Sequence, residues 1–205
     1  MTITSERQVE TTKLVRELLG ESYTHLRVKR VMIEEDLERK TSSVSCEGTD
    51  ESNGSTFIIA GQGVGLINAF FQGMVDRFAT EYPSLKTITF SSFSVQAHLD
   101  TKQELSGTDS EGEVTLQVAN SEGKLFRFTH VSRSVISSAV IVTLLGVEYF
   151  INSERAFVSA YHALKDAKER NRADLVQRFT NVMATLVQNT SYSEVTSKIR
   201  SEIGR

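Results

Sequence analysis

An internal repeat of about sixty residues constrains the fold of this chain most strongly. Residues 23–80 and 86–146 each predict three short strands followed by a helix. Strands joined by short glycine-rich turns pair as antiparallel hairpins. A single unit of this kind buries little apolar surface alone, so we expect the two units to share one core. The repeat therefore predicts an α+β fold of duplicated βββα units.

Alternating apolar and polar residues place the strands in both units. In the first unit we expect a helix that begins near Leu66 and ends before Pro83. In the second unit residues 134–145 are apolar nearly all round, and periodicity alone does not separate helix from strand there. The predicted strands are residues 23–33, 41–46 and 56–60, with a turn at 48–54, and residues 86–99, 113–119 and 125–128.

Helices are expected on both sides of the repeat. Each is predicted from an amphipathic stripe or a capping residue. We accordingly divide the chain into a duplicated domain over residues 1–150 and a helical extension over residues 151–205. The expected helices are residues 5–19 ending at Gly20, one starting at Asn152 or Ser153, one at 172–188, and a weaker helix or frayed tail at 191–203.

Composition and charge exclude several classes of function. The 205 residues carry 23 basic and 26 acidic side chains, and the basic residues 27–30 are followed at once by an acidic, solvated loop at 34–38, so we expect no nucleic-acid binding. The single cysteine, Cys46, is expected in a core strand and allows no intramolecular disulfide. The N-terminus lacks a signal-peptide pattern, and the apolar run at 135–147 is short for a bilayer. We therefore expect a cytoplasmic protein without a membrane partner.

A glycine-rich connection is the sharpest candidate site. Residues 61–65 read GQGVG and lead from a predicted strand into a helix, a geometry that presents backbone N–H groups to an anion. A dinucleotide fingerprint needs glycine at the position of Leu66 and a parallel βαβ unit, so that interpretation is disfavoured. Two interpretations stay open: the glycines permit a tight turn and nothing more, or the helix end receives a carboxylate or a partner's backbone.

The remaining polar residues form no recognisable catalytic or metal-binding pattern. The histidines, His25, His98, His130 and His162, are dispersed and lack the spacing of metal ligands. No nucleophilic side chain has a potential general base at a spacing typical of a catalytic motif. Asp109 lies in a predicted turn. We expect no metal, no cofactor and no catalytic residue, and a binding or assembly module that is not an enzyme.

Three segments of the repeat resemble one known domain. Residues 63–69 read GVGLINA, residues 107–114 read GTDSEGEV, and residues 132–139 read SRSVISSA. They resemble the Gly-Asn-Gly-Pro-Val-Asp-Ala, Gly-Thr-Asp-Ala-Gln-Gly-Glu-Val and Asp-Thr-Asp-Ile-Ile-x-Ala-Ser stretches of the C-terminal regulatory (dimerisation) domain of 2-isopropylmalate synthases and citramalate synthases. That domain is a βββα duplication, so the resemblance implies a helix for residues 134–145.

The resemblance also implies a function. In the family this domain dimerises and binds the feedback inhibitor, leucine or isoleucine, near the interface. We therefore expect a homodimer with an interface pocket for a small amino acid or keto acid. The implied ligand-binding residues are Gly63, Gly65, Leu66, Ala69 and Asp109.

Two departures from the family shape the alternative. Only 22 residues precede the first predicted strand, whereas the catalytic barrel of the synthases needs about 250, so we expect a non-catalytic chain without the barrel. Three family carboxylates are replaced, by Asn68, Ser132 and Ser134. Their loss favours an assembly subunit that docks a separate synthase catalytic chain and has no ligand of its own.

Overall fold

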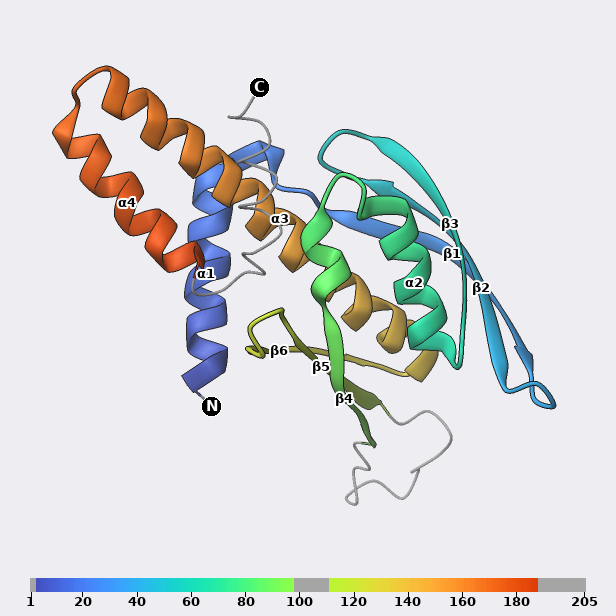
Figure 1. Ribbon diagram of the computed structural model, residues 1–205. Helices are drawn as coiled ribbons and strands as arrows, with labels where there is room; N and C mark the ends of the chain where they lie inside the picture. The colour runs from blue at the N-terminus through green and yellow to red at the C-terminus, as the bar shows by residue number, and fades with distance from the viewer. Residues whose placement is uncertain (1–2, 98–110, 188–205) are drawn as a thin grey trace.

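Two antiparallel sheets, each covered by one helix, and a group of helices at one end make up the protein (Figure 1). The computed structural model describes residues 3–97 and 111–187. The predicted α+β fold with antiparallel sheets and flanking helices is confirmed. The strands are β1 (Leu26–Asp36), β2 (Thr41–Asp50) and β3 (Ser55–Gly63) in one sheet and β4 (Thr89–Ala97), β5 (Gly112–Ala119) and β6 (Leu125–Ser132) in the other. The helices are α1 (Ile3–Leu19), α2 (Leu66–Phe78), α3 (Val135–Glu169) and α4 (Ala173–Val187), with short 3-10 turns η1 (Gly20–Ser22) and η2 (Pro83–Thr87).

The two units agree in detail as well as in element order. The first strand of each carries a register shift near its start, between Val28 and Arg30 in β1 and between Phe90 and Ser92 in β4. In both units two residues separate the end of the third strand from the start of the helix. A βββα unit requires neither feature, so their recurrence supports a duplication.

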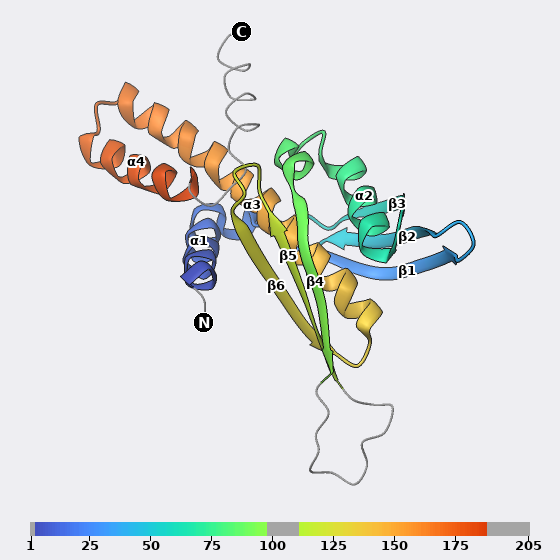
Figure 2. The same cartoon turned by 60° about the horizontal axis from the view of Figure 1, so that its bottom comes forward.

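One hydrophobic core serves both units. The helix α2 packs on β2 and β3, α3 packs on β5 and β6, and the two helices contact each other. Figure 2 shows α2 over the first sheet and α3 crossing behind the second. The centre of this core is formed by large side chains that are almost completely buried, among them Phe70, Met74, Leu85, Leu116 and Phe150. Cys46 belongs to the same core, as predicted, and burial raises the pKa of its thiol to about 11.

Several predicted boundaries are wrong. The strand β1 continues to Asp36 because residues 34–36, expected in a loop, pair with residues 41–43 of β2. The strand β2 continues to Asp50 because residues 48–50, expected in a turn, pair with residues 55–57 of β3. The predicted helix start at Asn152 or Ser153 is also wrong, since α3 runs unbroken from Val135 to Glu169. Both residues are at most 1% exposed in the middle of α3. Residue 150, where we divided the chain, therefore lies inside a continuous helix.

The long helix α3 is apolar because it is a core helix. By length and composition it would be able to cross a membrane, but 72% of its most apolar window is buried inside the protein. Burial against β5, β6 and α2 accounts for that composition. Residues 134–145, which the resemblance assigned to a helix, form its first turns after Ser134.

A second hydrophobic cluster joins the helices at the end of the molecule. It contains Val15 of α1, the α3 residues Ala156, Phe157 and Ala160, and Leu186 of α4. The predicted helices at 5–19 and 172–188 are thus confirmed as α1 and α4, whereas the segment at 191–203 lies outside the described residues. Although α1 precedes the repeat, it packs with the helical extension.

Two polar side chains in the middle of α3 hold the segment that leads into β1. The N–H of Leu26 donates to Glu148 Oε1 at 2.5 Å, and the N–H of Thr24 donates to Asn152 Oδ1 at 2.8 Å. The amide of Asn152 also donates to the carbonyl of Thr24 at 2.8 Å. The carboxylate of Glu148 lies 3.4 Å from His25 Nδ1, and its burial raises its pKa to about 7. These bonds fix where β1 starts relative to α3.

The raised pKa of Glu148 predicts a loss of stability with rising pH. The folded protein keeps a proton on this carboxyl up to about pH 7, while the unfolded chain releases it near pH 4.5. The stabilisation is therefore complete below about pH 4.5 and is lost as the pH rises through about 7. Glu148→Gln keeps an acceptor for Leu26, and its free energy of unfolding should lack the pH-dependent loss of about 3 kcal/mol that the wild type shows between about pH 4.5 and 7.

Urea unfolding of the variant and the wild type at several pH values checks this expectation. Glu169→Gln, an exposed change on the same helix, is the control and should retain the wild-type profile. Parallel profiles for Glu148→Gln and the wild type would contradict the assignment.

Candidate functional site

The glycines between β3 and α2 let a strand and a helix backbone approach closely. A Cβ added to Gly61 would lie 2.0 Å from the carbonyl oxygen of Ala69, and one added to Gly63 would lie 2.7 Å from the Ala69 nitrogen. On the helix side, a Cβ on Gly73 would meet the Ala60 carbonyl at 3.2 Å. The tight-turn interpretation thus explains Gly61 and Gly63. The antiparallel order of β1, β2 and β3 lacks the parallel βαβ unit of a dinucleotide site.

The start of α2 is nevertheless open to a ligand. Its N-cap residue is Gly65, which has no side chain to accept from the first-turn amides. The side chain of Asn68 turns back instead and accepts from the N–H of Val64 at 3.3 Å. The positive end of the helix dipole therefore meets no acidic cap here.

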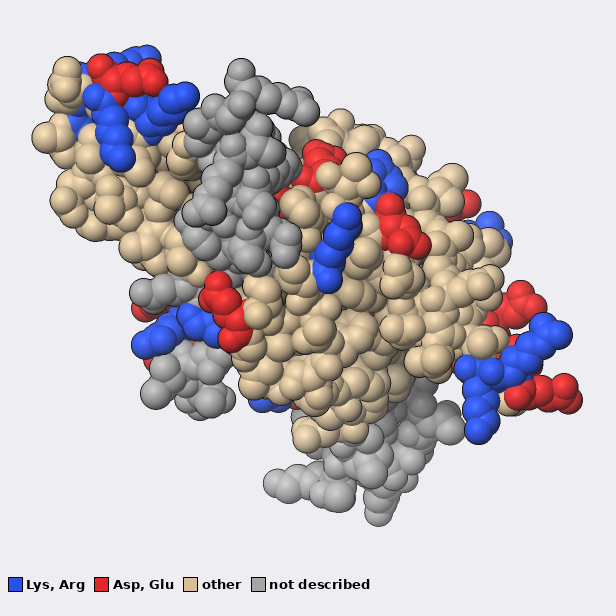
Figure 3. All heavy atoms as spheres, viewed as in Figure 1, with Lys and Arg blue, Asp and Glu red and all other residues tan. Residues whose placement is uncertain are grey.

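A surface hollow of about 650 Å³ lies beside this helix start. Gly63 and Val64 line one side, and Glu34, Asp36 and Arg39 of the β1–β2 hairpin line the other. A second hollow, of about 790 Å³, adjoins it and shares Glu34 as a lining residue. Figure 3 shows side chains of both charges gathered at the tip of that hairpin. The first hollow thus offers groups of both signs beside a helix N-terminus.

The hairpin that carries these charges is held in shape by Asp36. Its Oδ1 accepts from the N–H groups of Glu38 at 3.1 Å and Arg39 at 2.9 Å. The guanidinium Nε of Arg39 lies 3.7 Å from Asp36 Oδ2, and both side chains remain exposed. Lys40 follows with a φ of 54°, a left-handed conformation that closes the turn. The cation and the anion therefore stand together at the rim of the hollow.

The residues expected to bind a ligand fall into three groups. Gly63 lines the hollow, and Gly65 is half-buried at the N-cap next to it. Leu66 packs against the core, and Ala69 is fully buried beneath β3. Asp109 lies outside the described residues. The structure brings Gly63 and Gly65 together at the surface, while the other two helix residues face inward.

The serines that stand at two family aspartates bond within their own connection. Ser134 is the N-cap of α3 and accepts from the N–H of Ser137 at 3.2 Å. Ser132 Oγ lies 2.8 Å from Ser138 Oγ, which is also 2.9 Å from His130 Nδ1. The connection from β6 to α3 stands at the same place in the second unit as the connection from β3 to α2 in the first. The first connection is rich in glycine, whereas the second carries hydroxyl side chains that bond to one another.

Sequence reasoning missed the pair formed by Glu148 and His25. A carboxyl with a pKa near 7 resembles a general acid. Its side chain is only 6% exposed, however, and its oxygen already accepts from Leu26, so we interpret it as a structural group. The available signal was the spacing of Glu148 and Asn152, two polar residues one turn apart within the apolar stretch from Val147 to Ile151 and its flanks.

No group of three or more potential metal ligands is found within residues 3–97 and 111–187. No protein-family model and no curated protein matches the chain. The resemblance to the synthase regulatory domain therefore stays a prediction, and the candidate site rests on its geometry.

The close approach of β3 and α2 gives a direct test. Gly61→Ala places a methyl group against the helix backbone and should lower the free energy of unfolding by about 2 kcal/mol or more. Gly65→Ala is the matched control, because nothing lies within 4 Å of its added Cβ and its φ of 171° is extended. Urea unfolding of both variants measures the difference, and equal stability of the two would contradict the packing described.

Proposed function

We propose that this chain is a non-catalytic regulatory and dimerisation domain that binds a small amino acid or keto acid. The proposal rests on one observation, the hollow that places charges of both signs beside the start of α2. Arg39 in the lining suits a carboxylate, and α2 begins two residues after the lining residue Val64, with no acidic residue in its first turn. Glu34 and Asp36 suit an ammonium group, so an α-amino acid uses both sides of the hollow.

The dimensions and position of the hollow agree with this ligand class. A volume of about 650 Å³ falls within the range of small-molecule sites. Its lining comes from β1, β2 and β3 and the connections that flank them, so one small ligand would contact all three strands of the first sheet. No cofactor or metal enters the proposal.

A screen of the purified chain against amino acids and keto acids tests the proposed binding. A ligand present at 100 times its Kd should raise the free energy of unfolding by about 2.7 kcal/mol. Arg39→Ala should weaken amino acids and keto acids alike, about tenfold, whereas Glu34→Gln should weaken only the amino acids. Arg170→Ala, at an exposed ion pair between the C-cap of α3 and Asp166, is the control. A flat thermal-shift screen, or binding that survives Arg39→Ala, would overturn the site.

A second candidate function is that of an assembly subunit for a separate catalytic chain, with no ligand of its own. It is favoured by β4, an edge strand that carries no charge and leaves Phe90, Phe93 and Val95 about 40% exposed. The other edge of this sheet is covered, because Gln8 of α1 accepts from the N–H of Arg127 and donates to its carbonyl. An open apolar edge suits an added strand from a partner.

This alternative has its own test. If it is correct, the chain should co-purify with a barrel-type synthase subunit, and Phe93→Lys should abolish that capture by placing a charge on the open edge. Val131→Lys, at a similarly exposed position (44%) on the opposite edge strand β6, is the control and should preserve capture. A lone homodimer without such a subunit would count against this function.

A further inference from the structure

The edge strand β1 has an ordered distribution of charge. It reads LRVKRVMIEED, with basic residues in its first half, apolar residues at its centre and acidic residues in its second half. It lies at a free edge of its sheet, where β2 is its only extensive neighbour among the described elements (Figure 2). The other edges that no α1 side chain covers, β3 and β4, carry no charged residue.

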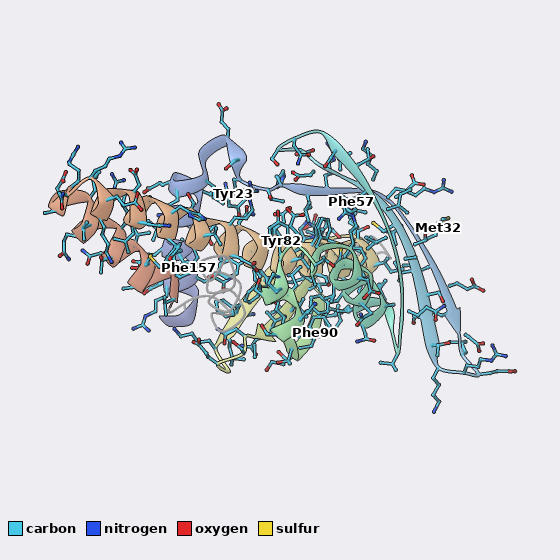
Figure 4. The ribbon with its side chains drawn as sticks, turned by 45° about the horizontal axis from the view of Figure 1, so that its top comes forward. Tyr23, Met32, Phe57, Tyr82, Phe90 and Phe157 are labelled. Atoms are coloured by element: carbon cyan, nitrogen blue, oxygen red, sulfur yellow. The ribbon has the colours of Figure 1, made fainter. Side chains whose placement is uncertain are left out.

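The register of the sheet tells which β1 side chains share a face. Arg30, Met32 and Glu34 point to the outer face, and Val31 and Ile33 point to the core side. Figure 4 shows Met32 on the side of the sheet away from α2, and this side chain is 49% exposed. Within the described part of the chain, Arg30 and Glu34 take part in no ion pair or side-chain hydrogen bond.

These positions are self-complementary about Met32. When two β1 strands run antiparallel with Met32 opposite Met32 of the partner subunit, Arg30 lies opposite Glu34 of the partner subunit. On the core side, Val31 lies opposite Ile33 of the partner subunit. Residues directly opposite in an antiparallel pair share a face, and this register satisfies that condition for every pair named.

Neighbouring arrangements lose this match. A shift that centres the pair on Ile33 keeps one charge pair, Arg30 opposite the partner's Asp36, but sets Val31 opposite the partner's Glu35 and Met32 opposite the partner's Glu34. A parallel pairing in register sets like charges side by side. Charges on an edge strand normally deter pairing with unrelated strands. The order of charges on β1 deters such strands and favours one partner, a second copy of β1.

We infer that β1 is the dimerisation edge of this protein, and that a second copy of the chain pairs with it antiparallel about Met32 to form one sheet across two subunits. This inference rests on the proposed function, which includes dimerisation, and names the surface that carries it. On this assignment the ligand hollow would lie beside the dimer interface. Glu34 lines the hollow, so Arg30 of the partner subunit reaches its rim.

Charge reversal tests this interface. Arg30→Glu or Glu34→Arg turns two attractive pairs into repulsive ones and should raise the dimer Kd about tenfold or more. The double variant R30E/E34R restores both pairs and should return the Kd to near the wild-type value. Lys165→Glu, an exposed position on α3, makes the same change in net charge as Arg30→Glu and should leave the Kd unchanged. Sedimentation equilibrium measures each Kd, and circular dichroism confirms folding.

A cross-link tests the register. Cα atoms directly opposite in an antiparallel pair lie about 4.5–5.5 Å apart, within the range that a disulfide spans. Met32→Cys should therefore form a covalent dimer under mild oxidation. Ile58→Cys, on the outer face of β3 and 71% exposed, is the control and should remain uncross-linked.

The outcomes separate the inference from the proposal beneath it. A wild-type chain that is monomeric at every concentration overturns the proposed dimerisation together with this interface. A dimer that ignores both charge reversals and gives no cross-link at Met32→Cys overturns only the assignment to β1. A dimer that Phe93→Lys abolishes places the interface on β4 and overturns that assignment as well.

Discussion

The contact between α2 and α3 is the interaction on which the rest of this structure depends. Each three-stranded sheet has one apolar face, and a single helix covers only part of it. Because the two covering helices also pack against each other, both faces become walls of one core. The glycines of β3 and α2 bring the first helix close enough for this contact. The β1–β2 hairpin extends beyond that core, which is why its charged residues stand at the surface.

Much of this fold could be predicted from the sequence, because it follows from local patterns. The alternation of side chains along the strands and the repeated element order are set by neighbouring residues. The predicted element boundaries were wrong where contacts between residues far apart in the sequence determine the structure. Asn152 resembles a helix cap locally, yet its partner is Thr24, which lies 128 residues earlier. Without that contact in view, an asparagine in an apolar helix is most simply explained as a helix start.

Part of the candidate site could be predicted from the sequence, because that part is also a local feature. The glycine connection is a local feature, so its exposed start at Gly63 was accessible to sequence reasoning. Ala69 lies one turn further along the helix, and only the close approach of β3 shows that it faces inward. The opposite wall of the hollow comes from Asp36 and Arg39, which sequence reasoning left in or beside a solvated loop. A wall made by a separate hairpin requires knowledge of strand register.

The placement of α1 affects the order in which the chain can assemble. This helix precedes both βββα units in the sequence, yet its partners come from late in the chain. Gln8 hydrogen-bonds to the backbone of Arg127 in β6, and Val15 packs with Ala156 and Leu186. An isolated helix of this length is marginal in water, so it gains lasting structure only from those later residues. During synthesis on the ribosome, Gln8 of α1 emerges 119 residues before Arg127, its partner on β6. The docking of α1 therefore depends on contacts of large sequence separation, and we expect it to form late in folding.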